Sequence, residues 1–560
     1  MHKKALWWAV VAALWCGAGT VAAQEPPPAP EYPSPEWYER EARNYARTLE
    51  GPTEQVSQSA FVTRLTQQSL ANLADYGARA VTDPSWLLAS SEPIRNLLNQ
   101  LDAPQVALAE LASLLRMLAE DPANAVQFSL NTPVTPLCSS YALQCAGDPF
   151  RYPGVDPFYG NEGLREAVVF YDRGCARISG HVWQPAETAG RLPGVVIENG
   201  SIQAPEPLYW WFAQTLVRAG YTVMTFDPRG QGRSDQQTPD FEQGSNANSA
   251  VFWEGLVDAI DFFRSTPQQP YPHNEGCAGT YPTPTTPHNP YYAIQDPDRL
   301  GLAGHSLGAT GVAVVQSYGA PGAEPWPGVL DASNPVDAVV AWDGLSTPAP
   351  ASEGRPAVVP RVPAMGQTSE YGIFGGPHTE PPDPDSHKGG FEGWRAAGVP
   401  VSQFTIRGST HFEWSNIPTF PSTSWCPDAA SGQCRDGWGL PMADHYSLAW
   451  LDRWLKRPGE AGYSDADARL LADAQWAERF SFYYRSARDF PTRTGELARC
   501  EDVAAGCPAQ ATQAAGNAAN LSDSGGVLSP WSLIVVLLAG LVRAATKRRY
   551  VRLLSVERGS

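Results

Sequence analysis

The chain has 560 residues, enough for one large domain with additions or for two to three domains. Its hydrophobic content of 43% is sufficient for a packed core, and 52 prolines and 50 glycines indicate many turns and long loops. The formal net charge of −18 argues against a nucleic-acid partner, because a nucleic-acid surface carries a basic patch.

Residues 1–23 are predicted to be a signal peptide. Lys3 and Lys4 are followed by an apolar stretch over residues 5–13, and the small residues 21–23 form a cleavage site before Gln24. The alternative, a buried helix, is less favoured because a proline-rich segment follows at once. We therefore expect export to the periplasm or cell surface.

Residues 24–163 are predicted to combine a proline-rich start with a helical N-terminal region. Apolar residues recur at spacings of three and four between residues 37 and 130, which is typical of amphipathic helices.

Residues 164–508 are predicted to form the catalytic domain, in which strands alternate with helices. Apolar runs such as LPGVVIENG and YTVMTFD are typical of buried parallel strands, and LYWWFAQTLVRAG is typical of an amphipathic helix. The alternation predicts an α/β fold with a mostly parallel sheet covered by helices on both faces. Residues 265–297, rich in Pro, Tyr and His, are predicted to be an insertion.

The C-terminal part is predicted to anchor the chain in a membrane. Residues 509–526 are a linker of small residues, residues 527–545 a transmembrane helix, and residues 546–560 a basic cytoplasmic tail. This orientation leaves the catalytic domain outside the cytoplasm. A terminal core helix is one alternative, and a sorting tail that is removed is another.

The cysteines indicate an oxidising compartment. Cys16 lies in the predicted signal peptide, and the even number that remains suits disulfides better than a zinc site, because no C-x-x-C spacing occurs. The predicted pairs are Cys138–Cys145, Cys175–Cys277, Cys426–Cys434 and Cys500–Cys507.

The stretch Gly304-His305-Ser306-Leu307-Gly308 is predicted to be a nucleophile elbow. An apolar strand precedes it and a helix pattern follows it, and glycines two residues on either side leave room for the unusual backbone of the serine. The alternative is a structural serine in a glycine-rich loop. The context favours Ser306 as the nucleophile.

A general base and an acid are expected after Ser306 in the chain. His411 follows the apolar strand VSQFTI through a short turn, so it lies at a strand's carboxyl end and is the predicted base. Two carboxylates follow the preceding strands. We favour Glu370 as the acid and keep Asp343 as the alternative.

Two backbone amides are predicted to form the oxyanion hole. Leu307 follows the nucleophile, and Ser201 lies in the Asn199-Gly200-Ser201 loop after the strand LPGVVIE, with Ile202 next to it. The loop DPRGQGRS after the strand YTVMTF lacks a G-K-[ST] sequence and is interpreted as the floor of the site rather than a phosphate loop.

These motifs occur in the order found in the α/β-hydrolase superfamily. VVIENGS, FDPRGQGRSD, GHSLGATG, VPAMGQTSEYG and GSTHF together resemble its secreted serine esterase, lipase and dienelactone-hydrolase-like branch. The resemblance covers a little over half of the chain. It implies an α/β-hydrolase fold and hydrolysis of carboxylic esters through an acyl-enzyme, with no metal or organic cofactor.

Aromatic residues in the predicted loops suggest a cleft for an acyl or aryl ester. The predicted substrate-binding residues are Ile202, Trp342, Tyr371 and Phe412. A lipase, a peptidase or amidase with the same triad, and a non-catalytic surface binding protein are the alternatives. The expected partner is a small-molecule or lipid ester, and nothing in the sequence indicates the oligomeric state.

Overall fold

The computed structural model describes the middle of the chain. It covers residues 162–507, apart from 189, 202–203, 205, 233, 236, 246–247, 282–283, 353, 371–382, 410, 412, 416–438 and 482. These residues all belong to one compact unit. The predicted signal peptide, N-terminal helices, linker and membrane helix lie outside the described residues. Within the described part, no helix is long and apolar enough to cross a membrane.

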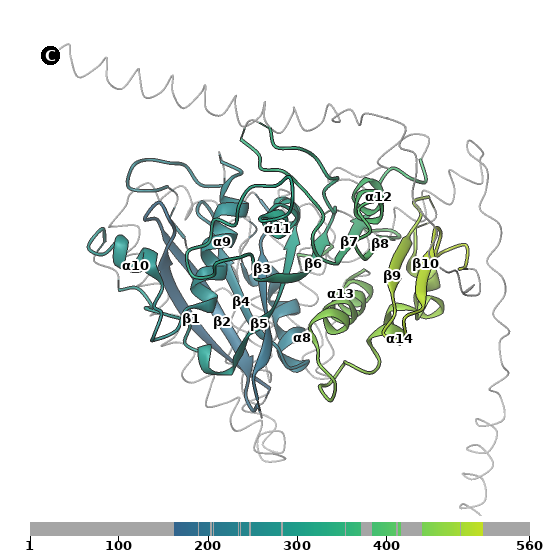
Figure 1. The fold of residues 1–560 in the computed structure, drawn as a ribbon, viewed down its shortest axis with the longest axis horizontal. Helices are drawn as coiled ribbons and strands as arrows, with labels where there is room; N and C mark the ends of the chain where they lie inside the picture. The colour runs from purple at the N-terminus through teal and green to yellow at the C-terminus, as the bar shows by residue number, and fades with distance from the viewer. Residues whose placement is uncertain are drawn as a thin grey trace, which may run out of the picture. The chain divides into compact units, whose positions relative to one another are not determined.

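A large mixed sheet runs through the described residues, with strand order β1-β2-β4-β3-β5-β6-β7-β8-β9-β10 (Figure 1). The strands are β1 (Gly163–Tyr171), β2 (Arg177–Pro185), β3 (Leu192–Glu198), β4 (Thr222–Asp227), β5 (Gln295–His305), β6 (Val336–Trp342), β7 (Ala364–Ser369), β8 (Val401–Ile406), β9 (Ala487–Pro491) and β10 (Leu497–Cys500). From β4 through β3 and β5 to β8, all neighbours are parallel. Both edges are antiparallel, formed by β1 and β2 on one side and by β9 and β10 on the other.

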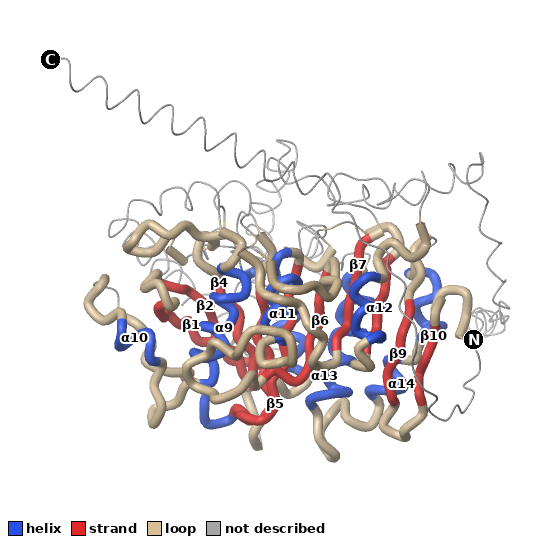
Figure 2. Tube along the Cα trace, turned by 45° about the horizontal axis from the view of Figure 1, so that its top comes forward, coloured by secondary structure: helices blue, strands red, loops and turns tan. Residues whose placement is uncertain are grey.

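The described helices are α8 (Trp210–Arg218), α9 (Val251–Arg264), α10 (Pro272–Gly276), α11 (Leu307–Ser317), α12 (Gly389–Ala396), α13 (Leu440–Leu455) and α14 (Ala466–Leu470), with short 3₁₀ helices η3 (Glu206–Tyr209), η4 (Tyr292–Ile294) and η5 (Asp473–Arg479). Figure 2 shows them lying along the strands of the sheet. Because the central strands are covered on both sides, strands such as β3 and β6 carry consecutive apolar residues instead of alternating ones.

Two hydrophobic clusters occupy the two faces of the sheet. Val195 of β3 packs with residues of α8 and α13 in one cluster, while the adjacent Val196 packs with residues of α9, α11 and α12 in the other. Successive strand residues point to opposite faces, so one apolar strand contributes to both clusters. The sheet is therefore a middle layer between two layers of helices, as the sequence predicts.

Some features differ from the sequence prediction. The antiparallel pairs at both edges, and strands β9 and β10, were not expected from the alternating pattern. Helix α13 begins at Leu440, with a proline in its first turn. The predicted insertion 265–297 contains α10 and η4.

Two predicted disulfides are confirmed. Cys175–Cys277 joins the turn after β1 to the residue that follows α10, and Cys500–Cys507 joins the end of β10 to the segment after it. The other two predicted pairs, Cys138–Cys145 and Cys426–Cys434, lie outside the described residues.

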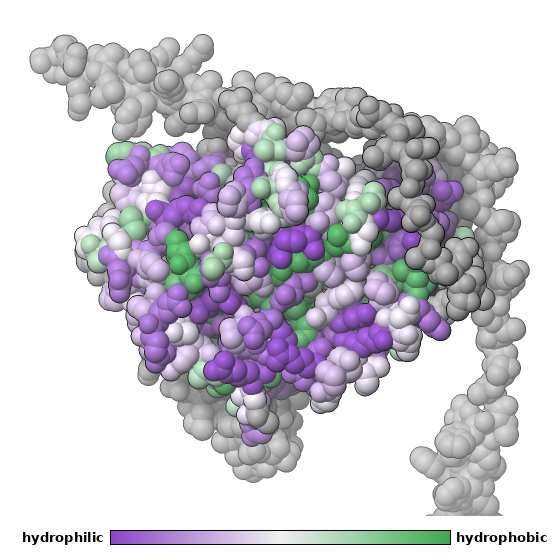
Figure 3. Space-filling view, viewed as in Figure 1, coloured by the Kyte–Doolittle hydropathy of each residue, from purple (hydrophilic) through white to green (hydrophobic). Residues whose placement is uncertain are grey.

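The surface seen in Figure 3 is mostly hydrophilic, with small hydrophobic patches between polar and charged residues. Among the described residues, the large apolar side chains that are exposed lie far apart in sequence: Leu164, Phe241, Val329 and Leu497. Scattered single apolar residues of this kind are ordinary for a globular domain.

Candidate active site

Ser306 occupies a sharp turn between strand β5 and helix α11. Its backbone has φ 58° and ψ −119°, a conformation that is uncommon for any residue other than glycine. The Ser306 N–H donates to the carbonyl of Trp342, 3.0 Å away at the end of the neighbouring strand β6. The turn is thus the strand–turn–helix geometry that the sequence predicts.

The two glycines around Ser306 lie where no side chain fits. A Cβ atom on Gly304 would be 2.3 Å from the carbonyl oxygen of Gly308, and a Cβ atom on Gly308 would be 2.3 Å from the carbonyl oxygen of Asn199. Real Cβ atoms essentially never come this close to another atom. The second contact also shows that the elbow packs directly against the loop after β3.

His411 lies in the loop after β8 and reaches Ser306. The distance between His411 Nε2 and Ser306 Oγ is 3.0 Å, which is within hydrogen-bonding range. The imidazole is mostly covered but remains 18% exposed, so a small molecule can reach the pair. The predicted nucleophile and base are therefore adjacent, although they lie 105 positions apart in the chain.

Asp343, at the end of β6, contacts the other nitrogen of the same imidazole. Its Oδ2 pairs with His411 Nδ1, and its Oδ1 accepts hydrogen bonds of 2.8 Å from both the N–H and the hydroxyl of Ser369. Burial acts to raise the pKa of Asp343, but His411 and these hydrogen bonds outweigh burial and hold the pKa well below its usual value. Asp343 therefore stays ionised beside His411.

Glu370, the acid favoured from the sequence, has a different role. It is fully buried, and its carboxylate accepts hydrogen bonds from the Gly408 N–H at 2.7 Å and from the Ser481 hydroxyl at 2.6 Å. The first of these supports the turn that leads to His411. Since Asp343 contacts the imidazole, the geometry corrects the preferred acid from Glu370 to the alternative, Asp343.

The predicted oxyanion-hole residues lie next to the nucleophile. Leu307 is the first residue of α11, where amides lack an acceptor within the helix. Gly200, just before Ser201, lies so close that a Cβ atom on it would be 3.4 Å from the Ser306 Cβ. The Ile202 position predicted beside them is outside the described residues.

The predicted substrate-binding side chains are only partly located. Trp342 is completely buried, stacks on Tyr209 and donates its indole N–H to the Ser447 hydroxyl, so its side chain belongs to the core and the expected substrate contact is corrected. A fully buried ring cannot line an open cleft. Tyr371 and Phe412 lie outside the described residues.

A buried chain of hydrogen bonds beneath Ser306 was not predicted. The Tyr209 hydroxyl accepts from the Gly200 N–H at 3.0 Å and lies 2.8 Å from His305 Nδ1. His305 Nε2 lies 2.7 Å from the backbone carbonyl of His411, so Nε2 carries the proton and Nδ1 accepts from Tyr209. This chain joins the loop after β3, the elbow and the loop after β8. His305 stands inside the elbow motif, but no sequence pattern identifies Tyr209 as its partner.

His305 is held in its neutral form. Burial, followed by the nearby His411, lowers the pKa of His305 to about 3. A neutral imidazole suits its two roles, because one nitrogen must accept a hydrogen bond while the other donates. His305 therefore stabilises the positions of the loops around the site, whereas His411 is placed to exchange a proton with Ser306.

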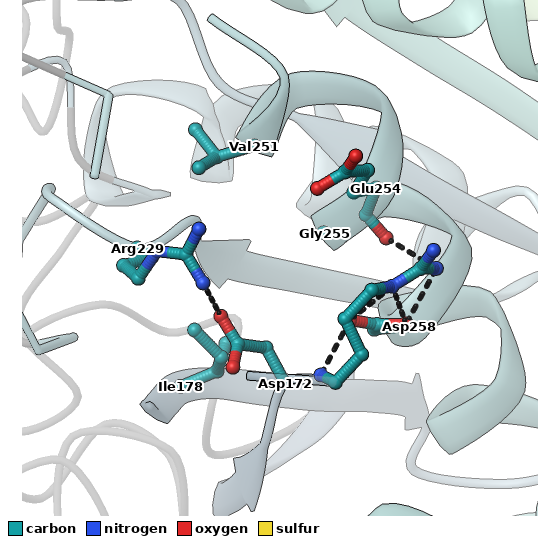
Figure 4. Close-up of a pocket in the computed structure, with 8 residues that line it drawn as sticks. Asp172, Ile178, Arg229, Val251, Glu254, Gly255 and Asp258 are labelled. Carbon is teal, nitrogen blue, oxygen red and sulfur yellow. Dashed lines mark hydrogen bonds and ion pairs between the residues drawn. The ribbon is translucent and has the colours of Figure 1, made fainter. Parts of the chain in front are cut away.

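The loop after β4 is held in place by ion pairs around a small pocket (Figure 4). Arg229 reaches Asp172 at 2.6 Å, and Arg173 pairs with Asp258 of helix α9 at 2.8 Å. Arg229 and Asp172 are both almost completely buried. The first pair fastens the DPRGQGRS loop to the residue that follows β1, in agreement with its predicted structural role. The second pair fastens the turn after β1 to α9.

Comparison with known proteins does not assign this arrangement to a family. No protein-family model matches the sequence, and no curated protein is significantly similar to it. The site is therefore interpreted from its own geometry.

We predict that Gly308→Ala lowers the free energy of unfolding by about 1–3 kcal/mol, because the added methyl group overpacks the contact between the elbow and Asn199. Gly255→Ala is the matched control, since Gly255 lies in helix α9 with no atom within 4 Å of its Cβ position. Alanine there favours the helix and leaves stability equal or higher. Urea unfolding measures both; equal effects of the two substitutions would contradict the packing argument.

We also predict an acid-dependent loss of stability from His305. Its folded-state pKa lies below the ordinary value of 6.5, so the unfolded chain binds the proton more readily. The stabilisation is present above about pH 6.5 and is lost as the pH falls toward about 3. Between about pH 7 and about pH 4, the free energy of unfolding of wild type is expected to fall by about 3 kcal/mol more than that of His305→Gln. Urea unfolding at both pH values is the measurement, and parallel losses in the two proteins would refute the assignment.

Proposed function

We propose that the protein is a serine hydrolase that cleaves carboxylic esters through Ser306, His411 and Asp343. The observation that carries the proposal is the 3.0 Å contact between Ser306 Oγ and His411 Nε2, with the opposite imidazole nitrogen on Asp343. A hydroxyl beside an imidazole that is itself oriented by a buried carboxylate is the arrangement that activates a serine nucleophile.

In the proposed reaction, His411 Nε2 accepts the Ser306 proton while Oγ attacks the ester carbonyl. The negative oxygen that develops is stabilised by the N–H groups of Leu307 and Ser201. His411 then donates the proton to the leaving alcohol, which leaves an acyl group on Ser306. A water molecule activated by His411 releases the acid and restores the enzyme. Throughout, Asp343 accepts a hydrogen bond from the His411 Nδ1–H, and it stabilises the imidazolium whenever His411 carries the extra proton.

The sheet supports assignment to the α/β-hydrolase superfamily. Its central strands are parallel, β2 is antiparallel to its neighbours, and the three triad residues follow β5, β6 and β8 at one edge. Ligands of open α/β sheets bind at the carboxyl ends of the strands. The nucleophile, acid and base also occur in the chain order expected for this fold.

Export is part of the same proposal. The two disulfides of the described domain favour an oxidising compartment, which agrees with the predicted signal peptide. We propose that the catalytic domain acts outside the cytoplasm, anchored by the predicted helix at residues 527–545.

We predict that a fluorophosphonate probe labels wild type and fails to label Ser306→Ala. Ser306→Ala and His411→Ala are each expected to lower the turnover of aryl esters by about 10⁴-fold or more, because nucleophile and base act as a unit. A chain-length series of 4-nitrophenyl esters, with a peptide amide series beside it, measures the substrate class. The proposal fails if wild type resists the probe or if Ser306→Ala retains turnover.

A second pair of variants tests the acid. Asp343→Asn is expected to lower kcat by about 10³–10⁴-fold, because an amide cannot hold the required tautomer of His411. Glu370→Gln keeps the size of the side chain and is expected to change kcat by less than about tenfold. It replaces one of the two buried acceptor oxygens by an NH2 donor, which lowers the free energy of unfolding by about 1–3 kcal/mol. Steady-state kinetics and urea unfolding of both variants are the measurements. A large loss of kcat in Glu370→Gln with a small loss in Asp343→Asn would assign the role of the triad acid to Glu370.

A further inference from the structure

The backbone of Gly200 is held on both sides by buried side chains. Its N–H donates to the Tyr209 hydroxyl at 3.0 Å, and its carbonyl accepts from Gln231 Nε2 at 2.6 Å. Gln231 is completely buried, and its Oε1 accepts from the Ala204 N–H at 2.8 Å. One side chain therefore joins two points of the loop after β3.

These contacts determine the direction of the next amide. In a trans peptide the carbonyl of one residue and the N–H of the next point in opposite directions. The Gly200 carbonyl points to Gln231, so the Ser201 N–H points away from it. Gly200 itself lies against the nucleophile, since a Cβ atom on it would be 3.1 Å from His305 Nδ1 and 3.4 Å from the Ser306 Cβ.

Gln231 is itself rigidly placed. Its backbone N–H donates to the Pro228 carbonyl at 3.0 Å, inside the loop that the Arg229–Asp172 ion pair fastens to β1 (Figure 4). Gly232, the next residue, has φ 50°, and a Cβ atom there would overlap the Asp227 carboxylate. The tight turn at these residues thus holds the backbone of Gln231, and with it the base of its side chain, in one position.

Asp227, at the start of the same turn, holds both ends of the β3 loop. Its Oδ1 accepts from the Asn199 side chain at 3.2 Å and from the Glu206 N–H at 2.8 Å. The loop after β4 thus contacts the loop after β3 at four points: Asn199, Gly200, Ala204 and Glu206. Of these, the Gln231 contact acts on the peptide that carries the Ser201 amide.

We propose that Gln231 is a positioning residue, which orients the Ser201 N–H toward the negative oxygen that forms during ester hydrolysis. This inference rests on the proposed function. It assigns the DPRGQGRS loop a part in transition-state stabilisation, because a donor contributes to catalysis only when it is already aimed at the developing charge. Gln231 touches neither substrate nor Ser306 in this role.

The test substitutes Gln231 in the full-length protein. Gln231→Glu keeps the shape and the acceptor for Ala204 but removes the donor to Gly200, and Gln231→Met fills the same space without a buried charge. Each is expected to lower kcat for a short-chain 4-nitrophenyl ester by about 10- to 100-fold, with KM unchanged within about threefold. This loss of kcat is smaller than the roughly 10²–10³-fold loss that follows when an oxyanion donor is deleted outright. The ratio of Gln231→Glu to wild-type kcat is expected to rise as the pH falls, because a protonated carboxyl regains a donor.

Gln316→Glu is the matched control. Gln316 is also completely buried and joins two backbone segments. Its Nε2 donates to the Ala313 carbonyl in α11 and to the Val359 carbonyl, and its Oε1 accepts from the Arg361 N–H. Gln316 belongs to the end of α11 opposite Ser306. Gln316→Glu is expected to reduce the free energy of unfolding and to leave kcat within about twofold.

The outcomes separate the two proposals. In the first outcome, a fluorophosphonate labels wild type, wild type cleaves the ester, and the Gln231 variants lose stability but keep kcat, as Gln316→Glu does. This outcome overturns the positioning role alone. Wild type that shows neither labelling nor turnover overturns the positioning role together with the hydrolase. A fall in kcat at constant KM that is confined to the Gln231 variants supports the inference, and Gln231→Met decides if Gln231→Glu does not fold.

Discussion

The backbone conformation of Ser306 is the constraint on which the rest of the site depends. A non-glycine residue at positive φ persists only where its surroundings hold it. Here the elbow is closed by contact between Gly304 and Gly308, and Gly308 in turn packs on Asn199. The strained turn and the loop after β3 therefore form one packed unit, which brings the proposed nucleophile and the proposed oxyanion donors together.

Two further contacts attach the remaining loops to this unit. The Ser306 N–H bonds to Trp342, which directly precedes Asp343, and His305 bonds to the backbone of His411. Asp343 also has positive φ, so the proposed nucleophile and acid are both strained and lie at the ends of neighbouring strands. Strain of this kind is characteristic of functional sites, where the backbone is preorganised by its surroundings.

The charges near the site are arranged by burial and by hydrogen bonding. Asp343 is buried, yet its hydrogen bonds and His411 keep it ionised. Glu198, directly before the oxyanion loop, is buried with no hydrogen-bond partner for its carboxyl oxygens among the described residues, and burial followed by Asp227 raises its pKa well above the usual range. A neutral Glu198 places no negative charge beside the position where the proposed oxyanion forms.

The sequence by itself determined the alternation of strands and helices from β1 to α13, the elbow glycines and the selection of Ser306 and His411 as candidates, because these depend on local periodicity and on turn chemistry. It did not distinguish Asp343 from Glu370, since both follow parallel strands that end at the same edge of the sheet. It also assigned Trp342 to a cleft, because an aromatic residue beside a functional position looks the same in sequence whether it faces solvent or the core. Only the tertiary structure decided these points and revealed Tyr209, His305 and Gln231, because hydrogen bonds between distant loops depend on the packing of the whole sheet and leave no periodic pattern in the chain.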